Sequence, residues 1–239
     1  MIDPNSRSRL AGVLLLTSVS ALIAGAAVVV PSGLTLNPAD PAAALAAVAG
    51  QTGLHLTELA LDVLGWLALT AAGLVLAAGA SEAPRPYLVV PAAGAAEAPR
   101  PYLVVLGGGL LAAAGLAGLL HDAGNLALTQ LSATPAALAS ATAVLLTAKW
   151  AVNLAGLLWV AATAATAAGL LLPAGLRRAG MAAALCGLAA VALPWTTGTG
   201  GPPAALEQLG YALHLPIMIW YGVLGVRCLR RRAMAEQAD

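Results

Sequence analysis

The chain of 239 residues is 60% hydrophobic and only 9% charged, and its mean hydropathy is +0.88. This composition excludes an ordinary soluble domain, in which about 25% of the residues are charged. A net charge of +1 offers no basic surface for nucleic acid. The two cysteines, Cys186 and Cys228, have neither the number nor the spacing of a disulfide framework or a zinc knuckle.

Six apolar stretches approach or exceed the roughly 20 residues that a helix needs to cross the hydrocarbon core of a bilayer. Because backbone polar groups need partners inside the membrane, each stretch is expected to be helical. The sequence therefore predicts an all-α polytopic membrane bundle, a single transmembrane domain over residues 1–239. We expect the first stretch to be retained, since it exceeds the apolar core of a signal peptide, roughly 7–15 residues. The six predicted helices are 10–30, 54–80, 102–120, 150–172, 180–195 and 206–229.

Two further helices are expected beside these spans, at about 41–49 and 136–148. For the first, Asp40 suits the N-cap position and Pro41 suits the first helical position. For the second, a start signal at Pro135 opens a helical run to residue 172, which is too long for one crossing. Residues 136–148 are therefore predicted to form a surface helix or an overhanging extension of the fourth span.

Every arginine falls on one side of this predicted topology, before the first span, between spans two and three, between spans four and five, or at and after the end of span six. Short loops rich in Lys and Arg mark the cytoplasmic side, so both termini are predicted to be inside. High alanine content and an excess of arginine over lysine favour a bacterium, and thus its cytoplasmic (inner) membrane. The arginines are Arg7, Arg9, Arg85, Arg100, Arg177, Arg178, Arg227, Arg230, Arg231 and Arg232.

A near-identical segment occurs twice in and around the second connection, at 77–90 and at 92–105. Two copies are too few for a repeat architecture, whose units stack to bury a shared face. We interpret them as a local duplication in a loop that tolerates insertion. A paired docking motif is the alternative.

Polar side chains inside the predicted spans gather toward the side without arginines. His55, Glu58 and Asp62 share one helix face at i, i+3 and i+7, and the sixth span opens with Glu207, Tyr211 and His214 at i, i+4 and i+7. Ionisable groups inside a membrane are costly and usually functional. The residues that we predict to form a polar cluster or ligand site are Glu58, Asp62, Asp122, Asn125, Lys149 and Asn153.

Three interpretations of this cluster stay open. A structural one pairs Lys149 with Glu58 or Asp62. A metal site would use His55, His121 and His214 with a carboxylate, the ligand types of catalytic zinc. Membrane hydrolases of the ceramidase and adiponectin-receptor type also use three histidines and an aspartate, but this chain has six predicted helices and lacks their paired histidines in a seventh helix. It also has no HExxH motif. Haem is less favoured, because no two histidines share a helix. A third interpretation is a proton or small-solute pathway, in which Pro216 kinks the sixth span.

Four segments together resemble a bacterial integral-membrane family that is known only as a domain of unknown function, of the four-three-eight-six type. They are RLAGVLL at 9–15, NPA at 37–39, LLPAGLRRAG at 171–180 and IWYGVLGVR at 219–227. The resemblance implies a six-helix membrane protein and brings no catalytic residues with it.

The sequence thus favours a non-enzymatic integral membrane protein, either an accessory subunit of a membrane complex or a protein that binds a small ligand or lipid near its external face. The alternatives are a zinc-dependent membrane hydrolase and a small-solute or proton-coupled transporter. The expected partners are the lipid bilayer and other membrane subunits, without nucleic acid. The cofactor is unknown, with zinc preferred over haem.

Overall fold

The computed structural model describes residues 4–34, 36–81, 100–132, 138–197 and 203–235, which form seven α-helices, one short 3₁₀ turn and no strand. All of the α-helices except α2 are long and apolar enough to cross a membrane. The prediction of an all-α membrane bundle with six spanning helices is confirmed. The elements are α1 (Pro4–Ser32), α2 (Pro41–Gly50), α3 (Thr52–Ser81), α4 (Pro101–Leu131), α5 (Leu138–Gly169), α6 (Ala174–Ala192), η1 (Leu193–Thr196) and α7 (Ala204–Ala235).

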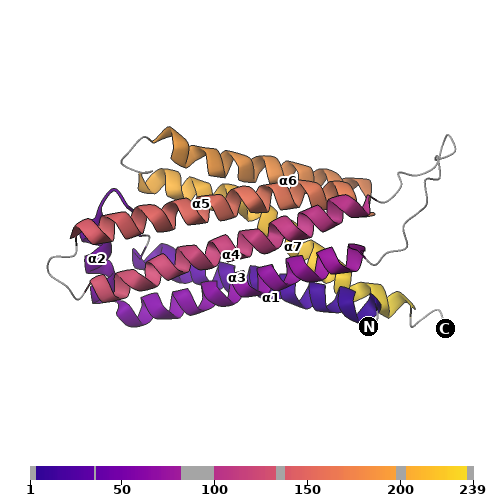
Figure 1. The fold of residues 1–239 in the computed structure, drawn as a ribbon, viewed down its shortest axis with the longest axis horizontal. Coiled ribbons are helices and arrows are strands. Elements are labelled where there is room, and N and C mark those ends of the chain that lie inside the picture. Colours follow the sequence, from indigo (N-terminus) through magenta and orange to yellow (C-terminus); the bar gives the residue numbers. More distant parts are fainter. Residues whose placement is uncertain (1–3, 35, 82–99, 133–137, 198–202, 236–239) are drawn as a thin grey trace.

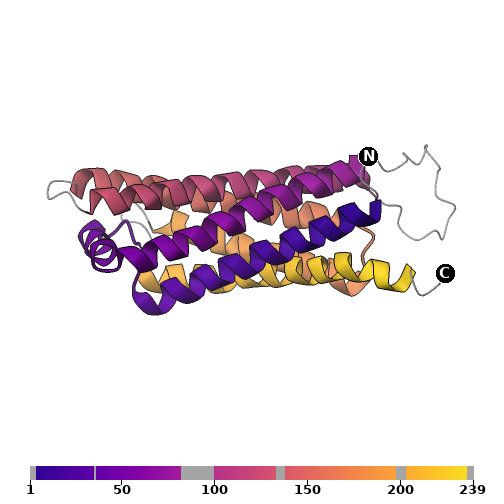
Figure 2. The ribbon, with the colours of Figure 1, turned by 90° about the horizontal axis from the view of Figure 1, so that it is seen from below.

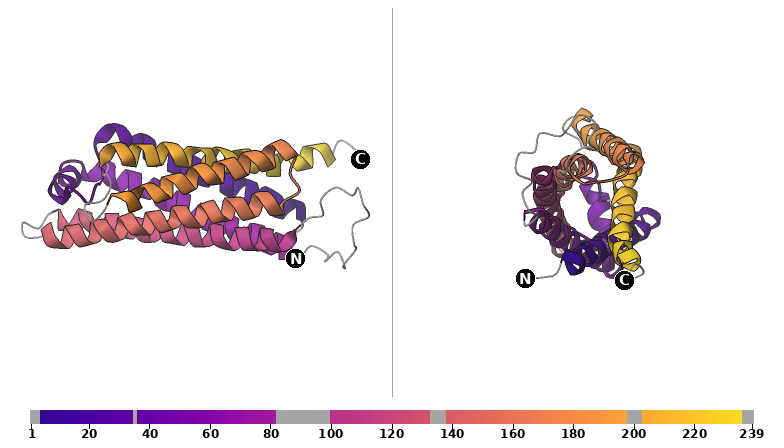
Figure 3. Two further views of the ribbon diagram at one scale, coloured as in Figure 1. Left: turned by 90° about the horizontal axis from the view of Figure 1, so that it is seen from above. Right: turned by 90° about the vertical axis from the view of Figure 1, so that its right-hand side faces the viewer.

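The six spanning helices form a closed ring in chain order. Each packs against the spanning helix that follows it in sequence, and α7 completes the ring by packing against α1. Seen end-on in Figure 3, they surround a common axis. The start of α1 and the end of α7 lie at the same end of the bundle, and α2 lies at the opposite end (Figures 1 and 2).

Aromatic side chains fill the interior of the ring near its middle. The ring centroids of Trp66 and Trp159 are 5.8 Å apart, and those of Trp159 and Tyr221 are 6.1 Å apart. These three side chains come from α3, α5 and α7, and all of them are buried in the main apolar core. Because large aromatic groups bury much apolar area, these three side chains form an aromatic column in the apolar core of the bundle.

Small residues allow the helices to approach closely. A Cβ atom on Gly73 would lie 2.5 Å from the carbonyl oxygen of Gly108, and one on Gly118 would collide with the indole of Trp66. The glycines at 107, 115, 156 and 187 are also packed against neighbouring helices. Gly109 is different, because it faces out of the ring and has open space around it.

Helix α2 begins as its sequence predicts. The side chain of Asp40 accepts a hydrogen bond of 3.0 Å from the backbone N–H of Ala43, and Pro41 occupies the first turn. Its apolar residue Ala44 packs against Leu128 and Leu145, near the ends of α4 and α5. This contact holds α2 against the end of the bundle.

Residues 138–148 do not form a separate surface helix, because they continue into α5 without a break. The overhanging extension is therefore the form that is seen, while residues 136 and 137 lie outside the described residues. Helix α4 likewise continues to Leu131, well past the predicted end at residue 120, since it packs along the extended part of α5. His121, Asp122 and Asn125 therefore lie inside a helix.

The fourth predicted span ends earlier than expected, at Gly169, and Pro173 precedes α6. The arginines of the described residues lie at the starts of α1, α4 and α6 or near the end of α7, all at one end of the bundle. Arg85 and residues 82–99 of the duplicated segment lie outside the described residues. The N-in, C-in orientation stays a prediction.

Candidate functional site

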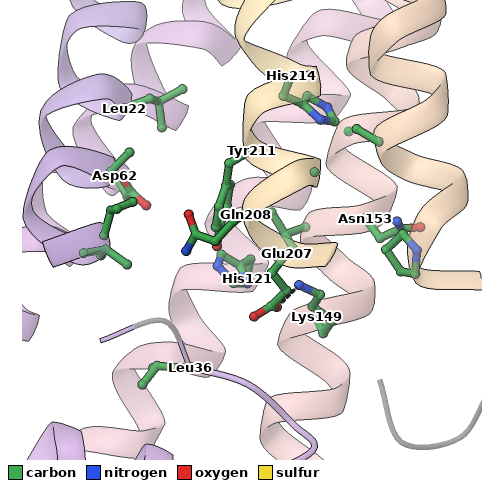
Figure 4. Close-up of a pocket in the computed structure, with 18 of the residues that line it drawn as sticks. Leu22, Leu36, Asp62, His121, Lys149, Asn153, Glu207, Gln208, Tyr211 and His214 are labelled. Atoms are coloured by element: carbon green, nitrogen blue, oxygen red, sulfur yellow. Dashed lines mark hydrogen bonds and ion pairs between the residues drawn. The ribbon is translucent and has the colours of Figure 1, made fainter. Parts of the chain in front are cut away.

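A cavity of about 500 Å³ lies inside the ring, in the half of the bundle that is remote from the arginines. All six spanning helices contribute to its wall, and most of the lining side chains are apolar. Trp66 and Trp159 form its inner limit, because the aromatic column begins there. Figure 4 shows how the polar side chains are distributed around it.

Two carboxylates of α3 line one side of the cavity. Glu58 and Asp62 lie one helical turn apart, close enough to interact electrostatically. Asp62 is ten residues after the start of α3, which places it about 15 Å along the helix axis at 1.5 Å per residue. Its carboxylate packs against Gly25 of α1, where a Cβ atom would collide with it. The absence of a side chain at Gly25 thus makes room for the acid.

A hydrogen-bonded network behind this wall connects α3, α4 and α5. Nδ1 of His121 is 2.8 Å from the carbonyl oxygen of Ala148, and its Nε2 is 3.0 Å from Nδ2 of Asn125. Nδ1 donates its hydrogen bond to the carbonyl, and the amide of Asn125 donates one to Nε2. This arrangement fits neutral His121 with its proton on Nδ1.

His55 joins the same network from α3. Its Nε2 is 3.1 Å from the backbone oxygen of Asn125, and its Nδ1 is 3.6 Å from Oε2 of Glu58. Nε2 must donate, because a carbonyl oxygen can only accept. His55 therefore fixes α3 against α4 and places its second nitrogen beside the first carboxylate of the cavity.

Asp122 of α4 is the third acid in this region. It is 2% exposed, and neither of its carboxyl oxygens has a hydrogen-bond partner among the described residues. It lies close enough to Asp62 and Glu58 to interact electrostatically with both. Three carboxyl groups from two helices are thus brought together.

The opposite side of the cavity contains an ion pair. Lys149 of α5 contacts Oε1 of Glu207, which is in the first turn of α7, and Nδ2 of Asn37 donates to Oε2 of the same carboxylate at 3.1 Å. The dashed line in Figure 4 marks the contact between lysine and glutamate. The expected pairing of Lys149 with Glu58 or Asp62 was wrong, because the closing of the ring brings α7 to α5 at this level.

Asn153 is bound within the fold on both sides of its amide. Its Nδ2 donates to the carbonyl oxygen of Val191 at 2.9 Å, and its Oδ1 accepts from Nε1 of Trp195 at 2.9 Å. These bonds attach the end of α6 and the turn η1 to α5. Although Asn153 lines the cavity, its hydrogen bonds are structural.

The cavity continues to the outer surface between α1 and α7. Ile23 and Leu215 line it from these two helices, yet they are 43% and 44% exposed. Toward the arginine end the same helices touch, since a Cβ atom on Gly12 would lie 2.8 Å from the carbonyl oxygen of Gly225. The helices therefore separate along their length and leave a side opening in the ring.

The structure brings most of the predicted cluster together. His55 and Asp122 are buried close to the cavity. The predicted residues that line it are Glu58, Asp62, His121, Asn125, Lys149, Asn153 and His214. The three histidines do not form a common ligand set: His214 lies beside Trp159 and Gly156, away from the other two. In the described parts of the chain, no group of three or more His, Cys, Asp or Glu side chains is arranged to hold a metal ion.

The predicted site left out several residues on the α7 side, although the sequence placed Glu207 and Tyr211 on one helix face with His214. Glu207 carries the ion pair, while Gln208 and Tyr211 extend from α7 toward the side of the cavity that holds Asp62 (Figure 4). The signal that pointed to them was the shared helix face of Glu207, Tyr211 and His214. Asn37 is in a loop, where spacing gives no such signal.

The fold and site define a multi-pass membrane protein with an internal cavity. Comparison of the chain with family models, with curated proteins and with solved structures finds no match.

Proposed function

We propose that this chain is a non-enzymatic integral membrane protein that binds a small amphiphilic ligand, such as a lipid, in the cavity of its helix ring. The observation that carries this proposal is the combination of a cavity of about 500 Å³ with a side opening between α1 and α7. Pockets for small ligands typically measure about 300–1,000 Å³ and are mostly apolar with a few polar groups.

The side opening favours an amphiphile over a water-soluble solute. Exposed apolar side chains such as Ile23, Val30 and Leu215 border it, and in a bilayer such side chains face lipid. An acyl or alkyl chain can pass between α1 and α7 without leaving an apolar environment. Its polar head would then meet the polar wall formed by Glu58, Asp62 and the pair of Lys149 with Glu207.

The orientation of the bundle in the membrane is part of the same proposal. Arginines at the opposite end of the bundle support an N-in, C-in topology in the cytoplasmic membrane of a bacterium. The cavity then lies toward the external side. A ligand taken from the outer leaflet would reach it by a short path.

The test is the lipid content of protein purified in a mild detergent, measured by extraction and mass spectrometry. Ala26→Trp would fill the side opening, because Ala26 lines the cavity on α1. Ala27→Trp is the matched control, since Ala27 is exposed on the same helix outside the cavity wall. We expect near-stoichiometric amphiphile in the unchanged protein and in the control, and its loss from Ala26→Trp. Equal contents in all three proteins would contradict the proposal.

A role as accessory subunit is the second candidate, and outward-facing small residues favour it. A Cβ atom added to Gly109 or Gly222 would meet no neighbouring atom within 4 Å, so another helix can approach these surfaces closely. This candidate predicts a companion chain that co-purifies at constant stoichiometry. A stable complex that is lost with Gly109→Leu or Gly222→Leu would support it over the ligand-binding function.

A further inference from the structure

The carboxyl groups around the cavity exceed the cationic groups available to them. Lys149 is already paired with Glu207, which has a side chain only 2% exposed. Asn37 gives the same carboxylate a second partner. The charge of Lys149 is therefore committed on the α7 side of the cavity and does not offset the acids of α3 and α4.

The carboxyl groups of Glu58, Asp62 and Asp122 must therefore be balanced by positive groups other than Lys149. Glu58 has His55 beside it, with Nδ1 at 3.6 Å from Oε2 of the carboxylate. No ion pair with Asp62 or Asp122 occurs among the described residues. Carboxylates that lie close enough to interact in a poorly solvated site oppose each other's ionisation, and these three do so. The region therefore takes up either protons or an added cation.

Buried polar atoms around these acids lack a partner. Asp122 is 2% exposed and unbonded at both oxygens, and Nδ1 of His55 has no hydrogen-bond partner within the described residues. Buried polar groups in native proteins are usually hydrogen-bonded, so each exception needs a physical reason. Neither side chain lines the cavity, so a cation bound at Glu58 and Asp62 would stabilise the buried carboxyl group of Asp122 through its charge, without contact.

We infer that the head group of the bound amphiphile is an organic ammonium ion, held by Asp62 and Glu58 on the cavity wall. This inference rests on the proposed ligand-binding function and specifies its ligand. Asp62 is the principal contact for the head group, because Glu58 already has Nδ1 of His55 beside it. Asp122 lies behind both and adds to the negative potential at the head group.

Aromatic residues of the same wall fit a cation of this kind. Trp66, Trp159 and Tyr211 all line the cavity, and aromatic faces attract ammonium groups within about 6 Å. Tyr211 extends from α7 toward the side on which Asp62 lies (Figure 4). An ammonium head near Asp62 would thus have carboxyl groups on one side and aromatic rings on its other sides. Its alkyl chain would extend to the opening between α1 and α7.

The experiment compares probes that share an alkyl chain and differ in head group. Full-length protein in phosphatidylcholine nanodiscs is titrated with dodecyltrimethylammonium, dodecyl sulfate, dodecanol or chain-free tetramethylammonium. Binding is followed by tryptophan fluorescence, because Trp66 and Trp159 line the cavity. We expect dodecyltrimethylammonium to bind most tightly, and Asp62→Asn to weaken its binding about tenfold, because the variant removes one negative charge beside the cation.

Two variants control for charge and for folding. Asp40→Asn removes one carboxylate from the cap of α2, outside the cavity, and should leave the affinity unchanged. Asp62→Glu keeps the charge and should retain the preference for the cationic probe. If Asp62→Asn does not fold, the ranking of probes on the unchanged protein decides.

Each outcome separates this inference from the proposed function. Equal binding of the cationic, anionic and neutral dodecyl probes would overturn the ammonium site and leave the cavity function standing. Tight binding of tetramethylammonium alone would overturn the amphiphile in favour of a soluble cation. Failure of every dodecyl probe to bind would overturn both proposals.

Discussion

The ion pair of Lys149 with Glu207 is the contact whose loss should lower stability most clearly. Lys149→Met removes the cation but keeps most of the side-chain volume, and it leaves a carboxylate that is 2% exposed with Asn37 as its neighbour. Removing one partner of a buried pair costs about 3–5 kcal/mol. Because the lysine side chain is 17% exposed and Asn37 stays in place, we expect about 3 kcal/mol.

A double-mutant cycle tests this reasoning. Lys149→Met, Glu207→Gln and the double variant are unfolded in mixed micelles of mild detergent and sodium dodecyl sulfate, and tryptophan fluorescence reports the free energy of unfolding. We expect the double variant to be more stable than Lys149→Met, with a coupling of about 2 kcal/mol. Arg178→Met, near the start of α6, is the control for loss of a cation. Single effects that simply add, within about 0.5 kcal/mol, would refute the pairing.

Three further predictions follow from the same contacts. Gly118→Ala places a methyl group against the indole of Trp66 and should lower stability by about 1–3 kcal/mol in thermal unfolding. Gly109→Ala is the control, because Gly109 lies in open space and the change should not lower stability. Equal effects of the two substitutions would contradict the close packing of Gly118 on Trp66. Asn153→Ala removes the acceptor of Trp195 and the donor to the carbonyl of Val191 on α6. We expect the free energy of unfolding to fall by about 1–3 kcal/mol and proteolysis near η1 to become faster. Unchanged proteolysis would argue against the attachment of η1 to α5 by Asn153. A reporter active only in the cytoplasm should be active when fused after the last residue, whereas activity confined to a periplasmic reporter would reverse the predicted orientation.

The helices and the start of α2 could be predicted because their signals are local. Apolar length alone identifies a spanning helix, and the pair Asp40 and Pro41 specifies a helix start through a hydrogen bond that spans three residues. The end of α4 was missed because hydropathy falls at His121 while the helix continues to Leu131. Contact between the two extended helices sustains it there, and hydropathy does not report such a contact.

The composition of the site could be predicted only within each helix. Spacing placed His55, Glu58 and Asp62 on one face, which the cavity wall and its hydrogen-bonded network bear out in part. The partner of Lys149 depended on which helix completes the ring beside α5. Apolar helix faces are too alike in sequence to specify that neighbour, so Glu207 could not be chosen over Glu58 or Asp62.

The two halves of the bundle differ in how closely α1 and α7 approach. In the arginine half, Gly12 and Gly225 bring the two backbones together. In the other half α1 has small residues from Ala24 to Ala27, and α7 faces the cavity with Tyr211 and Leu215 as well as Gly210 and Ala212, and there the helices separate. The separation leaves an unfilled space beside charged groups, and both features lower stability. Local departures from close packing are expected at functional sites, because the groups and the space that bind a ligand lower the stability of the fold. That asymmetry favours a ligand site over a bundle that only spans the membrane.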